Sequence, residues 1–198
     1  MNKTLETVRA QVAQSVSVKE ALLQNETLLS AIARVADLLV ATYRNGGKSL
    51  WAGNGGSAAD AQHMAAELVN KFCLDRDGLP AMALTVDTSA LTAIGNDYGY
   101  TQVFSRQIIA CGCPGDIFVG ISTSGNSANL VQALHACRQK GITTVALVGA
   151  NPCAMDAYDH VIHLPSTETP RIQECQTLVG HILCGAVESA LFGPGENS

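Results

Sequence analysis

Basic residues are few in this sequence, and nowhere do they form a cluster. Twelve lysines and arginines stand against seventeen aspartates and glutamates, so the formal net charge of the 198-residue chain is −5. Proteins bind nucleic acid mainly through basic surfaces, so no nucleic-acid partner is expected. An acidic protein that binds a phosphate group must use backbone dipoles and hydroxyl groups instead.

Long apolar runs are also missing. The first twenty residues are polar and contain no apolar block of the kind found in secretory signals. No uncharged run approaches the length of a membrane span, so no membrane partner is predicted. The seven cysteines are scattered and odd in number, which favours reduced thiols. Together these features predict a cytoplasmic protein.

Aromatic residues make up only 5% of the chain, but hydrophobic residues together reach 47%. This composition is ordinary for a soluble globular protein, and the length suits one α/β domain with a full core. Apolar segments that alternate with helical ones predict short strands at 49–52, 81–84, 117–121, 143–148 and 161–164. Long connections between such strands imply parallel pairing. We therefore expect an α/β fold in which helices flank a five-stranded parallel sheet, a flavodoxin-like sandwich.

The first 45 residues form a separate helical segment ahead of this core, which occupies residues 46–198. A break at residues 25–27 divides the segment into two helices, with Thr27 as a possible N-cap of the second. The segment could pack on the core or on a partner subunit, and the sequence leaves both open. The first helix has an apolar stripe at Leu5, Val8, Val12 and Val16.

A glycine-rich loop follows the first strand. Glycines let backbone N–H groups approach a ligand closely, and an alanine-rich helix with its partly positive N-terminus begins here. The corner therefore suits an anion, most often a phosphate. Ser57 adds a hydroxyl group at the expected helix cap. The candidate contacts are Asn54, Gly55, Gly56 and Ser57.

The loop admits two other interpretations. The pattern Gly53-x-Gly55-x-x-Ala58 satisfies a lax dinucleotide fingerprint, which needs an acidic residue about twenty positions later. Asp87 ends the second strand segment but lies considerably farther along. A tight turn without a ligand would explain the glycines, but it would not explain a second polar loop.

That second loop follows the third strand and contains four hydroxyl groups in six residues. Its position before a helix near Ala128 would let hydroxyl and N–H groups converge on one anion. Two such loops at neighbouring strand ends suggest that one binds a phosphate and the other binds sugar hydroxyls. Asn96 and Asp97 are expected in a loop after the helix that follows the second strand. The hydroxyl-bearing candidates are Ser122, Thr123, Ser124 and Ser127.

His63 and Glu67 stand four residues apart, so one helix face presents both. Such a pair could be a plain exposed hydrogen bond, or it could bind zinc. Gln173 and His181 supply further polar groups in an apolar helix expected from Thr169 to about Leu191. Eight helical residues span about 12 Å, so these two would have to lean together or come from different subunits to share one metal ion.

Five segments resemble one known family. The stretches 53–63, 65–68, 92–100, 120–127 and 169–174 are similar to those of the sedoheptulose 7-phosphate isomerase family in the sugar-isomerase (SIS) domain superfamily. The match spans nearly the whole chain after residue 30. It implies a SIS domain fold and conversion of a ketose to an aldose through an enediol, which supplies a heptose 7-phosphate for lipopolysaccharide or another surface polysaccharide.

The resemblance also implies roles for named residues. Glu67 would take the substrate proton and His181 would be its acid–base counterpart. The implied zinc ligands are His63, Glu67, Gln173 and His181, and the implied assembly is a homotetramer with active sites at subunit interfaces. The implied substrate contacts are Asn54, Gly55, Gly56, Glu67, Asn96, Asp97, Ser122, Thr123, Ser124, Ser127 and Gln173.

Two alternatives remain at this point. One is a non-catalytic SIS protein resembling the factor that binds the bacterial replication initiator DnaA, and the other is an isomerase of a different phosphosugar. The zinc ion could take part in proton transfer or only orient the substrate. The family often has a second histidine three residues after the glutamine, where this chain has Gln176.

Overall fold

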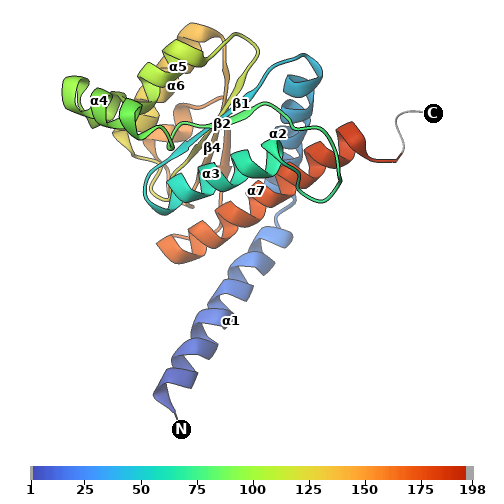
Figure 1. The fold of residues 1–198 in the computed structure, drawn as a ribbon. Helices are drawn as coiled ribbons and strands as arrows, with labels where there is room; N and C mark the ends of the chain where they lie inside the picture. Colours follow the sequence, from blue (N-terminus) through green and yellow to red (C-terminus); the bar gives the residue numbers. More distant parts are fainter. Residues whose placement is uncertain (1, 195–198) are drawn as a thin grey trace.

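A single parallel sheet organises the chain in the computed structural model, which describes residues 2–194 (Figure 1). Residues 195–198 of the predicted core segment lie outside the described part. The spatial order β2-β1-β3-β4-β5 is that of the flavodoxin-like sandwich, so the predicted fold class is confirmed. The strands are β1 (Ser49–Gly53), β2 (Ala81–Ala83), β3 (Ile117–Ile121), β4 (Thr143–Val148) and β5 (His160–His163).

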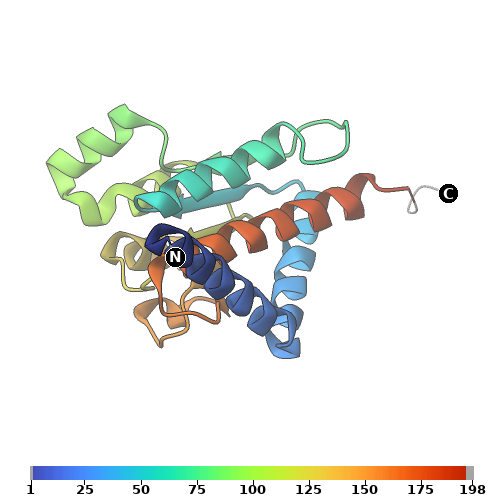
Figure 2. The same ribbon diagram turned by 90° about the horizontal axis from the view of Figure 1, so that it is seen from below.

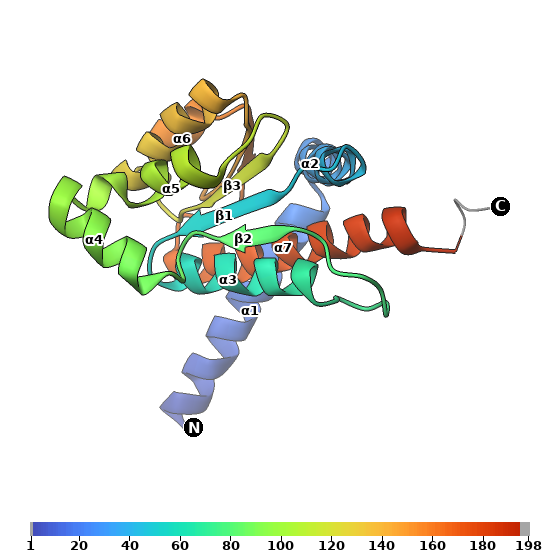
Figure 3. The same cartoon turned by 45° about the horizontal axis from the view of Figure 1, so that its top comes forward.

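Two helical layers cover the sheet, as seen most clearly in Figure 3. Strand side chains alternate between them, with Trp51 and Val119 in one apolar cluster and Leu50 and Phe118 in the other. The first cluster includes side chains of α2 (Glu26–Arg44), α3 (Gly56–Val69) and α7 (Thr169–Phe192). The second includes α5 (Val103–Cys111) and α6 (Ala128–Lys140).

The carboxyl ends of β1 and β3 meet at one edge of the sheet. Leu50 pairs with Phe118 and Gly53 pairs with Ile121, so the two strands end in register. The loops that follow them lead directly into α3 and α6. This register brings together two loops that are about seventy residues apart in sequence, as parallel pairing requires.

Helix α4 (Thr88–Tyr98) lies beside the second layer, away from α7 (Figures 1 and 3). The predicted loop position of Asn96 and Asp97 is wrong, because both residues lie in the last turns of this helix. A short 3₁₀ helix (Tyr100–Gln102) connects α4 to α5, and another (Ala154–Ala157) precedes β5. Gly99, at φ +84°, allows the chain to turn after α4.

The first helix, α1 (Lys3–Leu23), extends away from the sheet (Figures 1 and 2). Polar contacts fasten it to α7: Ser15 donates to Glu174 at 2.6 Å, and Arg171 Nη1 donates to the backbone oxygen of Gln11 at 2.6 Å. Its apolar stripe faces solvent, with Leu5, Val8, Val12 and Val16 each about half exposed in this single chain. The next helix, α2, packs its apolar face into the core.

The cap of α2 differs from the prediction. Thr27 is not the N-cap; Asn25 is, and its side-chain oxygen accepts the N–H of Leu28 at 3.0 Å. Asparagine is a stronger cap than threonine because its amide oxygen reaches the first turn well. This helix ends where the predicted helical segment of residues 1–45 ends, since Asn45 is its C-cap and Gly46 follows at φ +76°.

One helix within residues 2–194 is long and apolar enough to cross a membrane by length and composition, namely α7. It carries core side chains including Val179, Leu183 and Val187, all fully buried. A buried core helix passes the same test, and that is the role α7 has here. All seven cysteines lie in the described part of the chain and are free.

Candidate active site

The first part of the site is the corner between β1 and α3. Gly55, at φ +56°, is the N-cap of α3, so Ser57 does not cap the helix as predicted; it lies in the first turn and is buried. Glycine is required at position 53, because a Cβ there would lie 2.5 Å from the backbone oxygen of Ser57. Within residues 2–194 no side chain caps α3, although the N–H groups of Ser57 and Ala58 already donate to the backbone oxygens of Asn54 and Gly55, at 3.1 Å each. What this corner offers an anion is therefore mainly the partial positive charge of the helix N-terminus.

The second loop lies beside the first, after β3. The hydroxyl of Ser122 accepts the N–H of Gly125 at 3.1 Å and lies 3.3 Å from the hydroxyl of Ser127. Ser127 is the N-cap of α6, and its hydroxyl makes no capping bond within the described chain. Thr123 and Ser124 are more exposed than Ser122, which is buried. Two helix N-termini and a cluster of hydroxyls therefore face one edge of the sheet.

Asn54 is bound in place by residues that the sequence analysis did not single out. Its side-chain amide pairs reciprocally with that of Asn129, at 3.0 and 2.9 Å, and its oxygen also accepts the hydroxyl of Tyr100 at 3.3 Å. A 340 Å³ cavity is lined by these three residues with Thr101, Ser127 and Ala128. Only Tyr100 had a signal in the sequence, since it lies inside one of the family-like segments.

The third part of the site is where α3 meets α7. His63 Nε2 lies 2.8 Å from Nε2 of His181, and His63 Nδ1 lies 3.5 Å from Oε1 of Glu67. One ligand atom from each of the three residues fits within 4.8 Å of the others. Two imidazoles and a carboxylate are a donor set that zinc prefers in catalytic sites, so these residues could hold a divalent metal ion. We call His63, Glu67 and His181 the triad.

Close packing of the two helices brings the triad together. A Cβ on Gly180 would lie 2.3 Å from the sulfur of Met64, so glycine at this position lets α3 approach α7. The next residue on α7 is His181, whose ring centroid lies 5.0 Å from that of His63 at an interplanar angle of 78°. Burial of Met64 and Gly180 thus fixes the helix separation next to the triad.

Gln173 lies elsewhere along α7. Its amide packs on Gly56, since a Cβ there would meet Nε2 of Gln173 at 2.6 Å. These residues line a 390 Å³ pocket together with Asp60, Pro170, Glu174 and Thr177. No contact between Gln173 and the triad is recorded within residues 2–194. The structure thus places Gln173 beside the corner between β1 and α3 rather than at the triad of the same chain.

Asp60 stands one turn before His63 on α3 and lines the same pocket as Gln173. It accepts the hydroxyl of Thr177 at 2.9 Å. Burial raises the pKa of Asp60, while the Thr177 hydrogen bond and the nearby His63 and His181 act in the opposite direction. Asn96 and Asp97, by contrast, are exposed and hydrogen-bond to each other at 2.8 Å, at a distance from these groups on α4.

Gln176 occupies a structural position. It is fully buried, and its side-chain nitrogen donates to the backbone oxygen of Leu147 in β4 at 3.0 Å. Among the remaining histidines, His163 is held locally: it bonds to the backbone of Gly149 at 2.9 Å and pairs with Asp156 at 3.0 Å.

The fold and this site define the class of protein. The family model of the SIS domain matches residues 14–149. Solved structures agree: a phosphoheptose isomerase from Neisseria gonorrhoeae is 43% identical with a TM-score of 0.88, covering 94% of this chain and 99% of that one. One from Francisella tularensis is 35% identical with a TM-score of 0.90, covering 96% and 100%.

Curated relatives identify the particular family. A phosphoheptose isomerase from Aneurinibacillus thermoaerophilus is 55% identical over 93% of this chain and 94% of that protein. Phosphoheptose isomerase 2 from Campylobacter jejuni is 52% identical over 95% and 94%. The chain therefore belongs to the phosphoheptose isomerase family of SIS domain proteins, as its five sequence segments predicted.

Proposed function

We propose that this protein is an aldose–ketose isomerase that converts sedoheptulose 7-phosphate to D-glycero-D-manno-heptose 7-phosphate, acting in the cytoplasm to supply heptose for a surface polysaccharide. The observation that carries the proposal is the meeting of Glu67 with two imidazoles, from His63 and His181, at one point between α3 and α7. A base and a proton carrier held together are what an enediol isomerisation needs.

The chemistry moves protons and leaves the atom count unchanged. Glu67 removes a proton from C1 of the ketose, and electrons shift to the C2 oxygen to form an enediol. The proton returns to C2, while His181 moves a proton between the two oxygens, and C1 becomes the aldehyde. Glu67 is partly exposed, as a base that must reach a bound sugar has to be.

The other polar residues would bind and orient the sugar phosphate. The uncapped N-terminus of α6 with Ser122, Thr123, Ser124 and Ser127 suits the phosphate, and the corner at Asn54–Ser57 suits sugar hydroxyls. The carboxamide of Gln173 lies beside that corner and can contact the substrate. Asn96 and Asp97 stand on an exposed helix face, where a second chain could bring them to a site.

Zinc is the metal that we propose for the triad. When bound, it would polarise the substrate oxygens and stabilise developing negative charge. His63, Glu67 and His181 supply three donors in one chain. Gln173, the proposed fourth ligand, reaches them only if its side chain turns along α7 or if another subunit supplies it, because eight residues of helix span about 12 Å.

We further propose a homotetramer whose active sites lie between subunits. Glu67 stands eleven residues from the start of α3, which is about 16 Å along the helix axis, so the proposed sugar-binding corner and the carboxylate that transfers the proton are held apart within one chain. The exposed apolar stripe of α1 also needs a partner, because four half-exposed large apolar side chains in a row are costly in water.

The direct test is incubation of the zinc-supplied protein with sedoheptulose 7-phosphate, followed by NMR of anomeric protons. The parent should give a new aldose signal, and Glu67→Gln should lower the rate by roughly 10²–10⁴-fold. Glu26→Gln, which changes an exposed carboxylate on α2 in the same way, should keep the parent rate. No turnover by the parent, with the sugar phosphate still bound, would instead favour the non-catalytic SIS regulator.

A control with a ketohexose 6-phosphate separates the remaining alternative. Faster turnover of the shorter sugar than of the heptulose would assign the enzyme to a different phosphosugar. Equal loss of both activities in Glu67→Gln would show that one base serves both reactions.

A further inference from the structure

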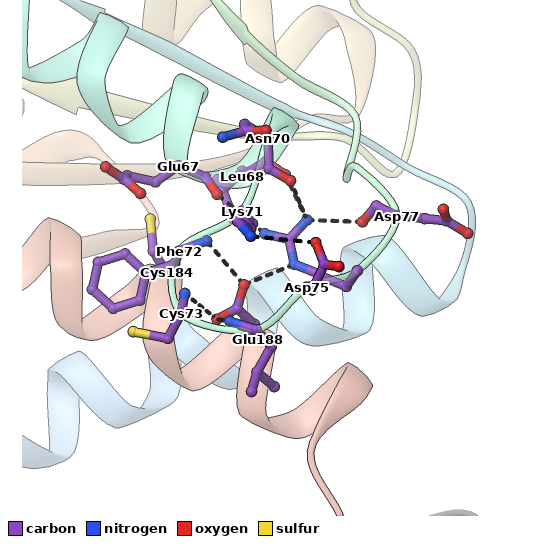
Figure 4. A network of polar contacts seen from close by, with 12 residues as sticks. Glu67, Leu68, Asn70, Lys71, Phe72, Cys73, Asp75, Asp77, Cys184 and Glu188 are labelled. Carbon is purple, nitrogen blue, oxygen red and sulfur yellow. Dashed lines mark hydrogen bonds and ion pairs between the residues drawn. The ribbon is translucent and has the colours of Figure 1, made fainter.

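A buried carboxylate on α7 holds the loop that follows α3 (Figure 4). Glu188 is 1% exposed and accepts three successive backbone N–H groups, those of Phe72 at 2.9 Å, Cys73 at 2.6 Å and Leu74 at 2.8 Å. It also pairs with Nε of Arg76 at 2.9 Å. Four donors from one short loop thus converge on a single side chain of the neighbouring helix.

Arg76 connects this carboxylate to the end of α3. Its guanidinium donates to the backbone oxygens of Glu67 at 3.1 Å and Leu68 at 2.9 Å, and to that of Asp77 at 2.8 Å. The last carbonyl groups of a helix have no partner inside the helix, so Arg76 acts as their cap. The helix end that carries Glu67 is therefore tied to α7 through Arg76 and Glu188.

The same loop touches the other helix of the triad. The backbone of Phe72 is bound to Glu188, and its ring centroid lies 5.5 Å from that of His181. The ring also packs on Gly185, where a Cβ would lie 3.2 Å from Phe72 Cε1. His181 thus contacts His63 on α3 and Phe72 on the loop.

We propose that Arg76 and Glu188 are positioning residues for the active site: they set how Glu67 on α3 faces His181 on α7. The proposal rests on the proposed function and extends it to residues that touch neither substrate nor metal. A buried ion pair adds little stability compared with apolar side chains of similar size, so stability alone is a weak reason for this one. Displacement of a reacting group by about 1 Å can lower the rate by about 10²-fold, so residues that fix the position of Glu67 relative to His181 can have a large effect on the rate.

The chain contains a matched control at the opposite end of the sheet. Asp116 is 2% exposed and accepts the backbone N–H groups of Lys48 at 3.0 Å and Cys113 at 2.8 Å. It also pairs with Nζ of Lys48 at 2.6 Å. These residues precede β1 and β3, whereas the site follows those strands. Asp116→Asn should therefore remove a similar buried carboxylate without moving the triad.

The experiment compares the parent, Glu188→Gln and Asp116→Asn by three readouts. The first is the NMR resonance of the His181 ring, assigned by its loss in His181→Gln, in the protein without metal or substrate. The second is the affinity and visible spectrum of bound cobalt(II), used as the probe metal. The third is kcat and KM for sedoheptulose 7-phosphate.

In Glu188→Gln we expect the His181 resonance to shift, the cobalt(II) affinity to fall by about 10–100-fold and the cobalt spectrum to change. We expect kcat to fall at least about tenfold while KM changes little, because within residues 2–194 no hydrogen bond or ion pair joins Arg76 or Glu188 to the loops that follow β1 and β3. Asp116→Asn should keep all three properties of the parent. Folded Glu188→Gln that matches the parent in all of them would overturn the proposal, as would equal changes in Asp116→Asn.

Two milder variants keep the test decisive if Glu188→Gln does not fold. Arg76→Lys retains a positive charge beside Glu188 but loses the two hydrogen bonds that the guanidinium donates to the backbone oxygens of Glu67 and Leu68. Phe72→Leu retains the backbone bond to Glu188 but removes the ring beside His181. Both should move the His181 resonance and lower kcat, and two unchanged variants would overturn the proposal. A parent that turns over no sugar disproves the proposed function only, since the resonance and cobalt measurements still decide the positioning.

Discussion

His63 and His181 lie with their Nε2 atoms 2.8 Å apart, although 118 residues separate them in the chain. The contact joins α3 to α7, and it places Glu67, one turn along α3, next to both imidazoles. Neither helix alone presents this donor set. The proposed chemistry therefore depends on the separation of these two helices, which Gly180 and Met64 set in the core.

Removal of one triad imidazole should weaken zinc binding. His63→Ala loses one of three nitrogen and oxygen donors, so we expect the zinc dissociation constant to rise by more than about tenfold. Titration with zinc in the presence of a competing chelator measures this change. His135→Ala, which removes an exposed imidazole on α6, should bind zinc as the parent does. Equal affinity of His63→Ala and the parent would contradict the proposed site.

Alanine at position 125 should disturb the hydroxyl loop. Gly125 has φ +63°, and a Cβ on it would lie 2.2 Å from Sγ of Cys153, so both the backbone and the packing oppose a side chain. We expect Gly125→Ala to lower the free energy of unfolding by about 1–3 kcal/mol and to raise KM for the sugar phosphate. Chemical denaturation and initial-rate kinetics measure the two effects.

The double variant Gly125→Ala/Cys153→Ala tests whether the contact with the sulfur of Cys153 causes the loss of stability. Loss of the sulfur removes the closest contact, so part of the stability should return, while the strain of the positive φ remains. A double variant as unstable as Gly125→Ala would show that the sulfur is not the cause, and would leave the positive φ and the 2.7 Å approach to Cβ of residue 153 as the source of the effect.

Acid should destabilise the fold through Glu188. Burial alone would raise the pKa of this carboxyl, but the three loop N–H groups and Arg76 outweigh it, so the pKa is lowered. A lowered pKa in the folded state means that the unfolded state binds the proton more readily. The stabilisation is therefore present above the unfolded-state value of about 4.3 and is lost as pH falls through the folded-state pKa.

Urea denaturation at several pH values between about 7 and about 3 measures this loss. Glu188→Gln should show a shallower decline of unfolding free energy with acid than the parent. Asp156 and Glu174, whose pKa values are also lowered, should account for part of the decline that remains. Parallel curves for the parent and Glu188→Gln would show that this carboxyl does not contribute.

Charges on the apolar stripe of α1 should break the proposed oligomer. In Val8→Asp/Val12→Asp, two carboxylates replace side chains that are more than half exposed in the single chain, so the monomer should stay folded. Burial of these charges at an interface would be strongly unfavourable. Light scattering should report a smaller particle, and kcat should fall if subunits share the site.

Ala10→Asp adds a charge to another side of the same helix and should leave the assembly intact. If Val8→Asp/Val12→Asp has the same particle mass and activity as the parent, the apolar stripe is not part of the interface.

Local patterns predicted the strands closely because a buried parallel strand is a short apolar run with polar or glycine boundaries. The segments 117–121 and 143–148 match β3 and β4 at both ends. Where several residues could satisfy the same backbone groups, local reasoning failed: Asn25 caps α2 instead of Thr27, and Gly55 precedes α3 where Ser57 was expected to cap it.

The sequence by itself determined the sheet, the two polar loops and the face shared by His63 and Glu67, because each depends on residues close together in the chain. Tertiary structure alone decided that His181 meets His63 while Gln173 packs on Gly56, and that Asn129 and Tyr100 hold Asn54. It also decided that Glu188 binds the loop after α3. Such contacts join helices far apart in sequence, and the close packing of side chains between them, which no local pattern encodes, fixes which residues meet.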